Sequence, residues 1–474
     1  MNILLAGEWN FDLTSYDTVW KGLVQIGLLL IALLVGNALR NIIPFFRKTL
    51  IPSALIGGAL LLLVNYIVKW VGNSDGFIDE TIMQVVTYHG LGIGFVAMTL
   101  KNSGKRGKAE RIKVLENGAM TGGAYMLQAV LGLLITIIFY LCTKNSSKEI
   151  FFSSGIILPL GFGQGPGNAL IWGKNLALES PLTFASGKDF GLTIASIGFI
   201  VASVIGVLYI NHFRKRGEIV HRIDTTKRTL EEFEGENEIP DTESIDKMTV
   251  QLCLVALVYG LAFGIMCAFA KISNFTNSLA WGFNFLWGVL TANLVKLVMK
   301  LLKKTKVMKR EYVNNYQMDR ISGFAFDLMI VAGVAAIDIV ALKDYAWVII
   351  VLCIAGALAT FLYIRIVSKH CFKGYEHEMF VTNFGTVTGT ASNGMILLKE
   401  IDPNYETPAA NSFVASQLPA MLFVAPLLLL LPMFFQNQEN PFKSVIIALI
   451  IFFVLFVAYT VFLFRKVLFK KKDK

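Results

Sequence analysis

Charged residues and cysteines are scarce in this chain of 474 residues. Asp, Glu, Lys and Arg make up only 16% of it and hydrophobic residues 55%, whereas an average soluble domain is about one-quarter charged. The five cysteines form no CxxC pair, which argues against a zinc ribbon or a disulfide framework. The five histidines are scattered, with no HExxH motif and no paired acidic motif. We therefore expect neither an enzyme nor an organic cofactor.

Long apolar blocks are what the chain has in abundance. A helix needs about 20 apolar residues to cross the hydrocarbon of a bilayer. About eleven blocks near that length occur, at residues 19–39, 50–71, 82–100, 118–142, 190–210, 250–270, 279–301, 321–342, 346–367, 413–434 and 445–464. The pattern predicts an all-α polytopic membrane protein surrounded by lipid.

The net charge of +10 comes from Lys and Arg residues that gather at every second connection between these blocks. Such residues accumulate on cytoplasmic loops, so the pattern predicts a protein of the cell inner membrane. It places the N-terminus outside and the C-terminus in the cytoplasm. Because no soluble domain collects the basic residues, we do not expect binding to nucleic acid.

Two apolar segments interrupt the alternation of sides. Residues 152–172 are rich in glycine around Pro166, and residues 379–398 combine glycine with Thr, Ser and Asn. Glycine and proline disfavour a regular helix and leave peptide groups that hydrocarbon cannot satisfy. We predict that both segments are re-entrant hairpins, the first entering from outside and the second from the cytoplasm. The alternative is that the glycines only let helices pack closely.

The order of blocks repeats on the two sides of a polar segment, residues 211–248, which is interpreted as a cytoplasmic linker. Residues 1–210 and residues 249–435 each contain five predicted spans and one hairpin, and residues 436–474 add one more span and a basic tail. An odd number of crossings turns the second half upside down. The sequence therefore predicts two inverted-topology repeats, an architecture found in many secondary transporters.

The chain resembles the bacterial sodium/glutamate symporter family. The similarity covers most of the chain, including the start of the second span, with Ile51, Pro52, Gly57 and Gly58, and both hairpins. The family's first hairpin typically carries Gly-His-Gly-Thr-Gly, and its second an Ala-Thr-Pro-Thr run. This chain keeps the glycines of the first run but has Gln164 and Pro166 in place of histidine and threonine, and in place of the second run it has Thr390, Ala391, Ser392 and Asn393.

Membership of the sodium/glutamate symporter family would imply sodium-driven glutamate uptake and a homodimer. It would also imply a mobile domain that contains both hairpins and moves relative to a fixed scaffold. The extra terminal span departs from the family's usual ten crossings. The backbone of the first hairpin is kept while its side chains differ, so the resemblance supports the fold more strongly than the substrate.

An anion inside a membrane needs a positive potential, and no arginine lies in the middle of a predicted span. We expect hairpin backbone amides and bound sodium to supply it. The candidate substrate-binding residues are Gly163, Gln164, Gly165, Gly167, Asn168, Gly389, Ser392 and Asn393. Hard cations prefer oxygen ligands, so the candidate sodium ligands of the second hairpin are Asn383, Thr386, Thr388 and Thr390.

Two carboxylates complete the candidate sodium ligands. Asp327 and Asp338 lie in the predicted span 321–342, and their spacing, close to three helical turns, would place both on one face roughly 16 Å apart. A carboxylate within a membrane is costly and usually functional. For Asp338 the alternative is an interfacial residue that reaches water.

Other functions remain open at this point. The first alternative is a proton- or sodium-coupled carrier of another small carboxylate or amino acid, using Asp327 or His89, although a histidine within a span more often only bonds a neighbouring helix. An intramembrane enzyme would need a catalytic dyad or metal cluster, which the sequence lacks. A passive channel would not need two opposed hairpins.

Overall fold

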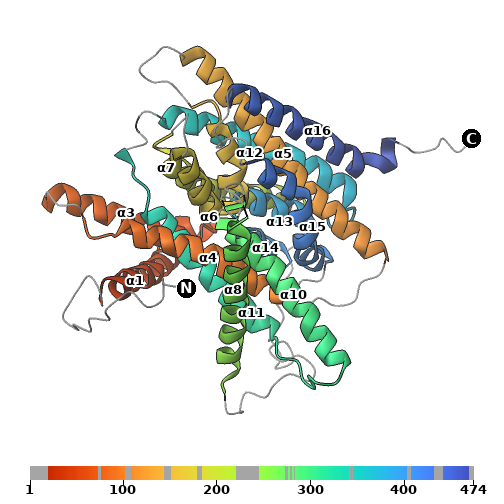
Figure 1. Cartoon of the computed structure of the whole chain (residues 1–474). Helices are drawn as coiled ribbons and strands as arrows, with labels where there is room; N and C mark the ends of the chain where they lie inside the picture. Colours follow the sequence, from red (N-terminus) through yellow and green to blue (C-terminus); the bar gives the residue numbers. More distant parts are fainter. Residues whose placement is uncertain are drawn as a thin grey trace, which may run out of the picture.

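The computed structural model describes residues 20–72, 76–101, 108–143, 151–178, 184–219, 245–272, 276–277, 280–281, 283–340, 343, 345–402, 407–431 and 441–468. Most of the predicted linker lies outside these ranges. The elements of this part of the chain are helices (Figure 1). The longer ones are α1 (Lys21–Ile42), α3 (Ser53–Gly72), α4 (Glu80–Leu100), α5 (Lys108–Thr143), α6 (Ile157–Leu178), α7 (Gly187–Lys215), α8 (Lys247–Ala270), α10 (Asn284–Lys304), α11 (Asn315–Ala335), α12 (Ala346–Cys371), α13 (Glu376–Thr388), α14 (Ala391–Ile401), α15 (Ala409–Leu430) and α16 (Pro441–Leu468).

Among the described residues, nine helices are long and apolar enough to cross a membrane, or ten if α15 counts as one bent span. The two parts of α15 meet at 42°, at Pro419, which cannot donate the helical hydrogen bond. Of the eleven predicted blocks, α11 is the one outside this set, because it carries Asp319, Arg320 and Asp327. The many apolar helices indicate a multi-pass membrane protein.

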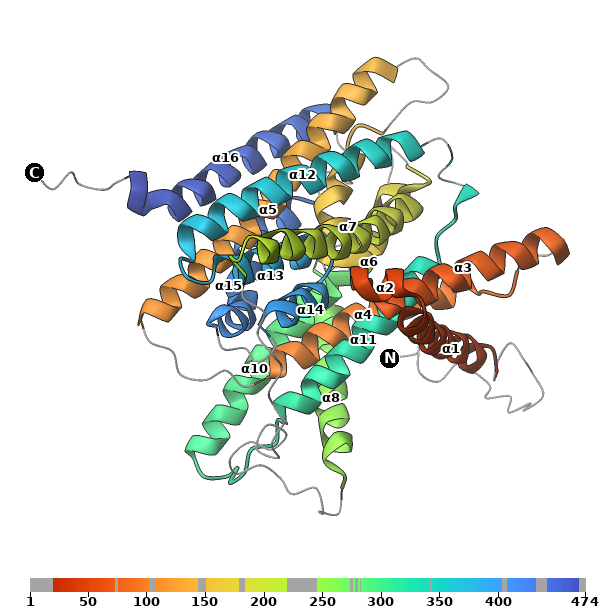
Figure 2. The same cartoon turned by 180° about the vertical axis from the view of Figure 1, so that it is seen from behind.

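The helices form two lobes, seen from opposite sides in Figures 1 and 2. Lobe A contains α1, α3, α4, α8, α10 and α11, which pack on one another. Lobe B contains α5, α6, α7, α12, α13, α14, α15 and α16. The main contacts between the lobes are those of α6 with α4 and α11. Lobe A thus takes three helices from each half of the chain, and lobe B takes two helices and a broken segment from each half, together with α16.

The helix pairs of lobe A occur twice. α1 packs on α3 as α8 packs on α10, α3 packs on α11 as α10 packs on α4, and α1 touches α11 as α8 touches α4. α4 and α11 pack on each other at the centre, where a Cβ on Gly90 would lie 2.9 Å from the Ala325 carbonyl oxygen. Small residues of this kind let membrane helices approach closely.

The last helix, α16, is an integral part of lobe B. It packs mainly on α5 and also on α12. Arg465 of α16 contacts Glu116 of α5 at 2.9 Å, and the Glu116 side chain is 3% exposed. The Tyr459 hydroxyl donates to the Phe423 carbonyl of α15 over 3.0 Å. Glu116 is also paired with Lys113 at 3.0 Å, and together these bonds hold the C-terminal part of α16 against α5.

Candidate functional site

The first helix break lies at Gly165, within α6. Its φ of 74° and ψ of −172° are not helical, and this backbone region is essentially restricted to glycine. Pro166 follows and begins the second helical part of α6, where a missing N–H is tolerated. The glycine-proline pair therefore divides α6 into two helices at the position that the sequence indicates.

The second break lies between α13 and α14, at Gly389 and Thr390. The two helices fold back on each other, because a Cβ on Gly385 of α13 would lie 2.9 Å from the Gly394 Cα of α14. A Cβ on Gly394 would lie 2.2 Å from the Thr382 carbonyl oxygen. Only glycine at both positions permits this approach.

The two breaks meet inside the protein. A Cβ on Gly165 would lie 3.2 Å from Thr390 Cγ2 and 3.9 Å from the Gly389 carbonyl oxygen. The Met329 methyl group of α11, in lobe A, lies 3.9 Å from the same position. Segments more than 200 residues apart in the sequence thus come together at the boundary between the lobes.

A cavity of about 90 Å³ lies at this meeting point. Its wall includes polar side chains of both breaks and of α5 and α15, and apolar side chains of α4, α10, α11 and α15. The lining residues are Leu91, Phe95, Thr121, Tyr125, Gly163, Gln164, Phe285, Phe326, Met329, Thr386, Thr390, Ala391, Gln417, Ala420, Met421, Val424 and Leu428. None of them carries a formal charge. The volume is below the 300 Å³ or so of ordinary ligand pockets, so in this conformation the cavity has room for only a small group.

Amide side chains at the breaks have hydrogen-bonding groups without a protein partner. Both polar atoms of Gln164 and both of Asn168 are buried and unpartnered, and so is Nδ2 of Asn393. Asn168 is fully buried and Asn393 is 4% exposed. Buried polar groups normally find partners, and an unmade bond costs about 1–3 kcal/mol. These amides are therefore the strongest sign of a polar ligand.

Helix ends add to the potential around the cavity. α14 begins at Ala391, and the second part of α6 begins at Pro166. N-termini of helices carry partial positive charge and free N–H groups, whereas C-termini carry partial negative charge and free carbonyls. Because each break joins a C-terminus to an N-terminus, both signs are present without a charged side chain.

Polar residues of α5 support both breaks. The Tyr125 hydroxyl donates to the Gly163 carbonyl over 2.5 Å, and Gln128 Nε2 donates to the Val387 carbonyl over 2.9 Å. Each bond satisfies a carbonyl at the end of a half-helix. The sequence interpretation missed these residues. The spacing of Asn117, Thr121, Tyr125 and Gln128 along one face of a long span was the available signal.

Three of the four predicted sodium ligands of the second hairpin are buried and donate to their own helix, whereas Thr390 is half-buried. Thr386 and Thr388 donate to the carbonyls of Thr382 and Phe384, at 2.7 and 2.6 Å. Asn383 Nδ2 donates to the carbonyl of Met379 at 2.9 Å. Thr386 and Thr390 line the cavity, whereas Asn383 and Thr388 do not. Their oxygen lone pairs remain able to accept a cation.

The remaining candidates of the hairpins lie at or beside the breaks. Gly163 lines the cavity, Gly167 packs against Leu91 of α4, and Gly389 packs against Asn393. The side chain of Ser392 lies outside the described part of the structure. Gln164 also lines the cavity, whereas Gly165, Asn168 and Asn393 lie at or beside the breaks but outside its lining.

The two aspartates do not share a helical face, so that prediction is wrong. α11 ends at Ala335, and Asp338 lies beyond it, where its backbone N–H donates to the Asp189 carboxylate over 2.8 Å. The Tyr66 hydroxyl donates to Asp338 Oδ1 over 2.8 Å. Bonds to Tyr66 of α3 and Asp189 of α7 thus take the place of the hydrogen bonds that a further turn of α11 would make. Asp327 is exposed on α11 and does not line the cavity.

His89 bonds a neighbouring helix. Its Nδ1 lies 2.9 Å from the Tyr259 hydroxyl of α8. Within the described residues, no group of three or more His, Cys, Asp or Glu side chains could hold a metal ion. A cation at the breaks would therefore be coordinated by neutral oxygens.

Comparison with known proteins adds no assignment. No protein-family model matches the chain, and a search of curated proteins finds no match.

Proposed function

We propose that this protein is a secondary transporter that carries a small organic anion, with L-glutamate and sodium as substrate and coupling ion. The observation that carries the proposal is the meeting of two broken helices, Gly165 against Thr390, at a cavity between two lobes. Broken helices that meet at the midplane form the substrate sites of many secondary transporters.

The repeated packing of lobe A supports an inverted repeat. The three pairings described above relate α1, α3 and α4 of the first half to α8, α10 and α11 of the second. Two equivalent halves with opposite topology can exchange roles, so that the site opens first to one side and then to the other. In this proposal the hairpins are re-entrant, the N-terminus is outside and the protein lies in the cell inner membrane as a homodimer.

The neutral lining is consistent with an anionic substrate. The N-terminus of α14 and that of the second part of α6 would face a carboxylate, and Gln164, Asn168 and Asn393 have free amide groups to orient it. Since the carboxylate would arrive without a paired side chain, a co-bound cation at the lone pairs of Thr386 and Thr390 would balance its charge. This requirement explains coupling to sodium in physical terms.

A carrier of a different small carboxylate is the second candidate. The small volume of the cavity and its wall of Phe95, Phe285 and Phe326 favour an acid with fewer charged groups than glutamate. Both the ammonium group and the second carboxylate of glutamate would have to find partners among backbone groups.

The test is transport by the purified protein in liposomes. Uptake of radiolabelled L-glutamate is measured with an inward sodium gradient, and separately with potassium or proton gradients alone. Accumulation that depends on sodium is the expected result. Uptake of another carboxylate but not of glutamate would make that carboxylate the substrate. Uptake with a proton gradient alone would make the proton the coupling ion. No transport of any small carboxylate under any gradient would reject the proposal.

A further inference from the structure

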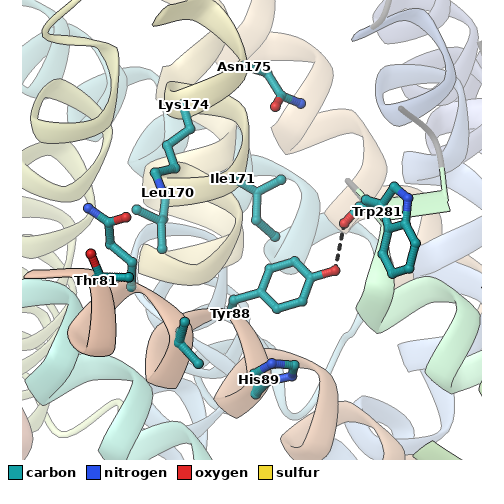
Figure 3. Close-up of a pocket in the computed structure, with 10 residues that line it drawn as sticks. Thr81, Tyr88, His89, Leu170, Ile171, Lys174, Asn175 and Trp281 are labelled. Atoms are coloured by element: carbon teal, nitrogen blue, oxygen red, sulfur yellow. Dashed lines mark hydrogen bonds between the residues drawn. The ribbon is translucent and has the colours of Figure 1, made fainter. Parts of the chain in front are cut away.

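A second pocket of about 330 Å³ lies between the first half of α4 and the second half of α6 (Figure 3). Lys174, Asn175, Leu170 and Ile171 of α6 line it on one side. The other walls are formed by Thr81, Gln84, Val85, Tyr88 and His89 of α4, together with Trp281. The volume falls within the usual range for small-molecule sites, about 300–1,000 Å³. We name it the outer pocket, because the proposed topology places it on the outer side of the breaks.

The residues around the outer pocket are fixed by hydrogen bonds. The Tyr88 hydroxyl donates to the Trp281 carbonyl over 2.9 Å, as Figure 3 shows. His89 is bonded to Tyr259, and Asn284 Nδ2 donates to the Tyr88 carbonyl over 3.0 Å. The aromatic walls are therefore held in place, a condition for specific binding.

Lys174 gives the outer pocket its charge. It is exposed, and it forms no ion pair with the described part of the chain. The nearby Lys188, by contrast, is paired with both Glu80 and Asp189. No acidic residue lines the outer pocket, and the Glu80 carboxylate, which accepts from Gln84 Nε2 over 2.5 Å, is itself paired with Lys188. Lys174 is therefore the formal charge of the lining, and it attracts anions.

A contact between α4 and α6 lies between residues that line the outer pocket and residues that line the central cavity. On α4, His89 lines the outer pocket and Leu91 lines the cavity. On α6, Leu170 lines the outer pocket, and Gly167, one turn earlier, packs against Leu91, whose Cβ lies 2.9 Å from a Cβ placed on the glycine. α4 belongs to lobe A and α6 to lobe B, so a movement between the lobes would open this contact.

We propose that the outer pocket is a capture site, in which Lys174 binds the carboxylate of the substrate before it passes the Leu91–Gly167 contact to the breaks. The inference rests on the proposed function and adds to it a second, charged binding site. The central cavity has room and polar groups for a desolvated carboxylate but no charge to draw one from water. The outer pocket has the charge and the volume, and Asn175 can donate a further hydrogen bond, whereas Gln84 Nε2 already donates to Glu80.

The first experiment measures the charge of the outer pocket without requiring transport. Thr81→Cys is introduced into a variant that lacks Cys142, Cys253 and Cys267, the three cysteines that are not buried. Membrane-impermeant methanethiosulfonates, one with a sulfonate and one with a quaternary ammonium group, are added from outside. We measure the rate at which each reagent modifies the cysteine at position 81. The ratio of the rate for the anionic reagent to the rate for the cationic reagent should fall about fivefold or more with Lys174→Gln. Lys174→Arg should preserve the ratio, and so should Lys271→Gln, which removes a charge outside the outer pocket.

An unchanged ratio with Lys174→Gln, or a cysteine that reacts only from the inside, would overturn the capture site. The second experiment is uptake of L-glutamate, for which Lys174→Gln should raise KM about tenfold at an unchanged kcat. An unchanged KM also overturns the proposal. If the labelling ratio behaves as expected but the wild-type protein takes up no glutamate, the failure concerns the proposed substrate and not the outer pocket.

Discussion

The two helix breaks share a cavity but differ in the polar groups that they present. At the first break, the side-chain amides of Gln164 and Asn168 have no hydrogen-bonding partner among the described residues. At the second, Thr386 and Thr388 already donate to their own helix, which leaves only oxygen lone pairs free. The first break therefore offers two complete amides, with donors and acceptors for a polar ligand, whereas the second offers mainly acceptors for a cation, with Asn393 Nδ2 as an additional unpartnered donor among the described residues. We infer that the first break binds mainly the substrate and the second mainly the ion.

The largest effect is expected from Gly165→Ala. A side chain in this backbone region costs about 1–3 kcal/mol, and the new methyl group would press on Thr390, so the two breaks should separate and uptake should fall below detection. Gly217→Ala is the matched control, because Gly217 also has a positive φ of 73° but nothing within 4 Å of its Cβ position. It should lose some stability and keep transport. Equal losses of uptake in both variants would show that transport does not depend specifically on the backbone at Gly165.

Replacement of an unpartnered amide should separate function from stability. Asn168→Leu removes buried groups that make no bond, so the apparent melting temperature in detergent should stay the same or rise, while substrate binding falls about tenfold or more. Asn65→Leu is the control, because Asn65 is also buried but accepts bonds from the backbone of Phe77 and Ile78. It should melt at a lower temperature. A destabilised Asn168→Leu protein would mean that the amide has a structural partner.

The second break should respond to sodium rather than to substrate. Thr386→Val keeps the shape and removes the oxygen, so we expect the sodium concentration for half-maximal uptake to rise about tenfold, with little change in the substrate KM at saturating sodium. Thr87→Val removes an identical buried bond in α4, from Thr87 to the Met83 carbonyl, and should change neither constant. A shift in substrate KM alone would reverse the assignment of the two breaks.

The support from α5 should matter to both breaks. Gln128→Leu leaves the Val387 carbonyl buried without its donor, which costs about 1–3 kcal/mol. Tyr125→Phe removes the donor to the Gly163 carbonyl and should cost about 1 kcal/mol. Thermal unfolding in detergent compares the two variants. If neither variant changes the melting temperature, α5 does not hold the half-helices.

The smallest effect concerns pH and lies outside the breaks. Asp79 caps α4 through the Ile82 N–H, and its ion pair with Lys21 holds the pKa of the carboxyl below its usual value. The stabilisation is present above the pKa of the unfolded chain, about 4, and is lost as pH falls through the lower folded value. Asp79→Asn should cost about 0.5–1 kcal/mol near pH 7. The difference from the wild-type protein should vanish in melting curves recorded below the folded pKa.

Local patterns predicted the helices and the breaks because each depends on neighbouring residues. Apolar blocks of the right length become helices in a membrane, and Gly165 with Pro166 breaks a helix wherever it lies. The end of α11 could not be predicted in this way. Ala336 and Ile337 favour a helix as well as their predecessors do, and the helix stops because Asp189 and Tyr66, distant in sequence, bond the backbone and side chain of Asp338.

The site was predictable in part for the same reason. Gln164, Asn168 and Asn393 were proposed because they stand in glycine-rich segments, and the structure places them at or beside the broken helices. Tyr125 and Gln128 were missed because their function depends on which helix packs beside the hairpins, which no local pattern records. Asp327 was proposed from its charge and depth in a span, yet its direction around the helix, away from the cavity, is set by packing of α11 on α3 and α4.

The most direct test of the central claim is an electron cryo-microscopy reconstruction of the protein in lipid nanodiscs with sodium and a substrate that it transports. The account predicts ligand density between Gly165 and Thr390, within hydrogen-bonding distance of Gln164 or Asn168, and a cation beside Thr386 or Thr390. Ligand density elsewhere, with the space between the two breaks empty under transporting conditions, would contradict it.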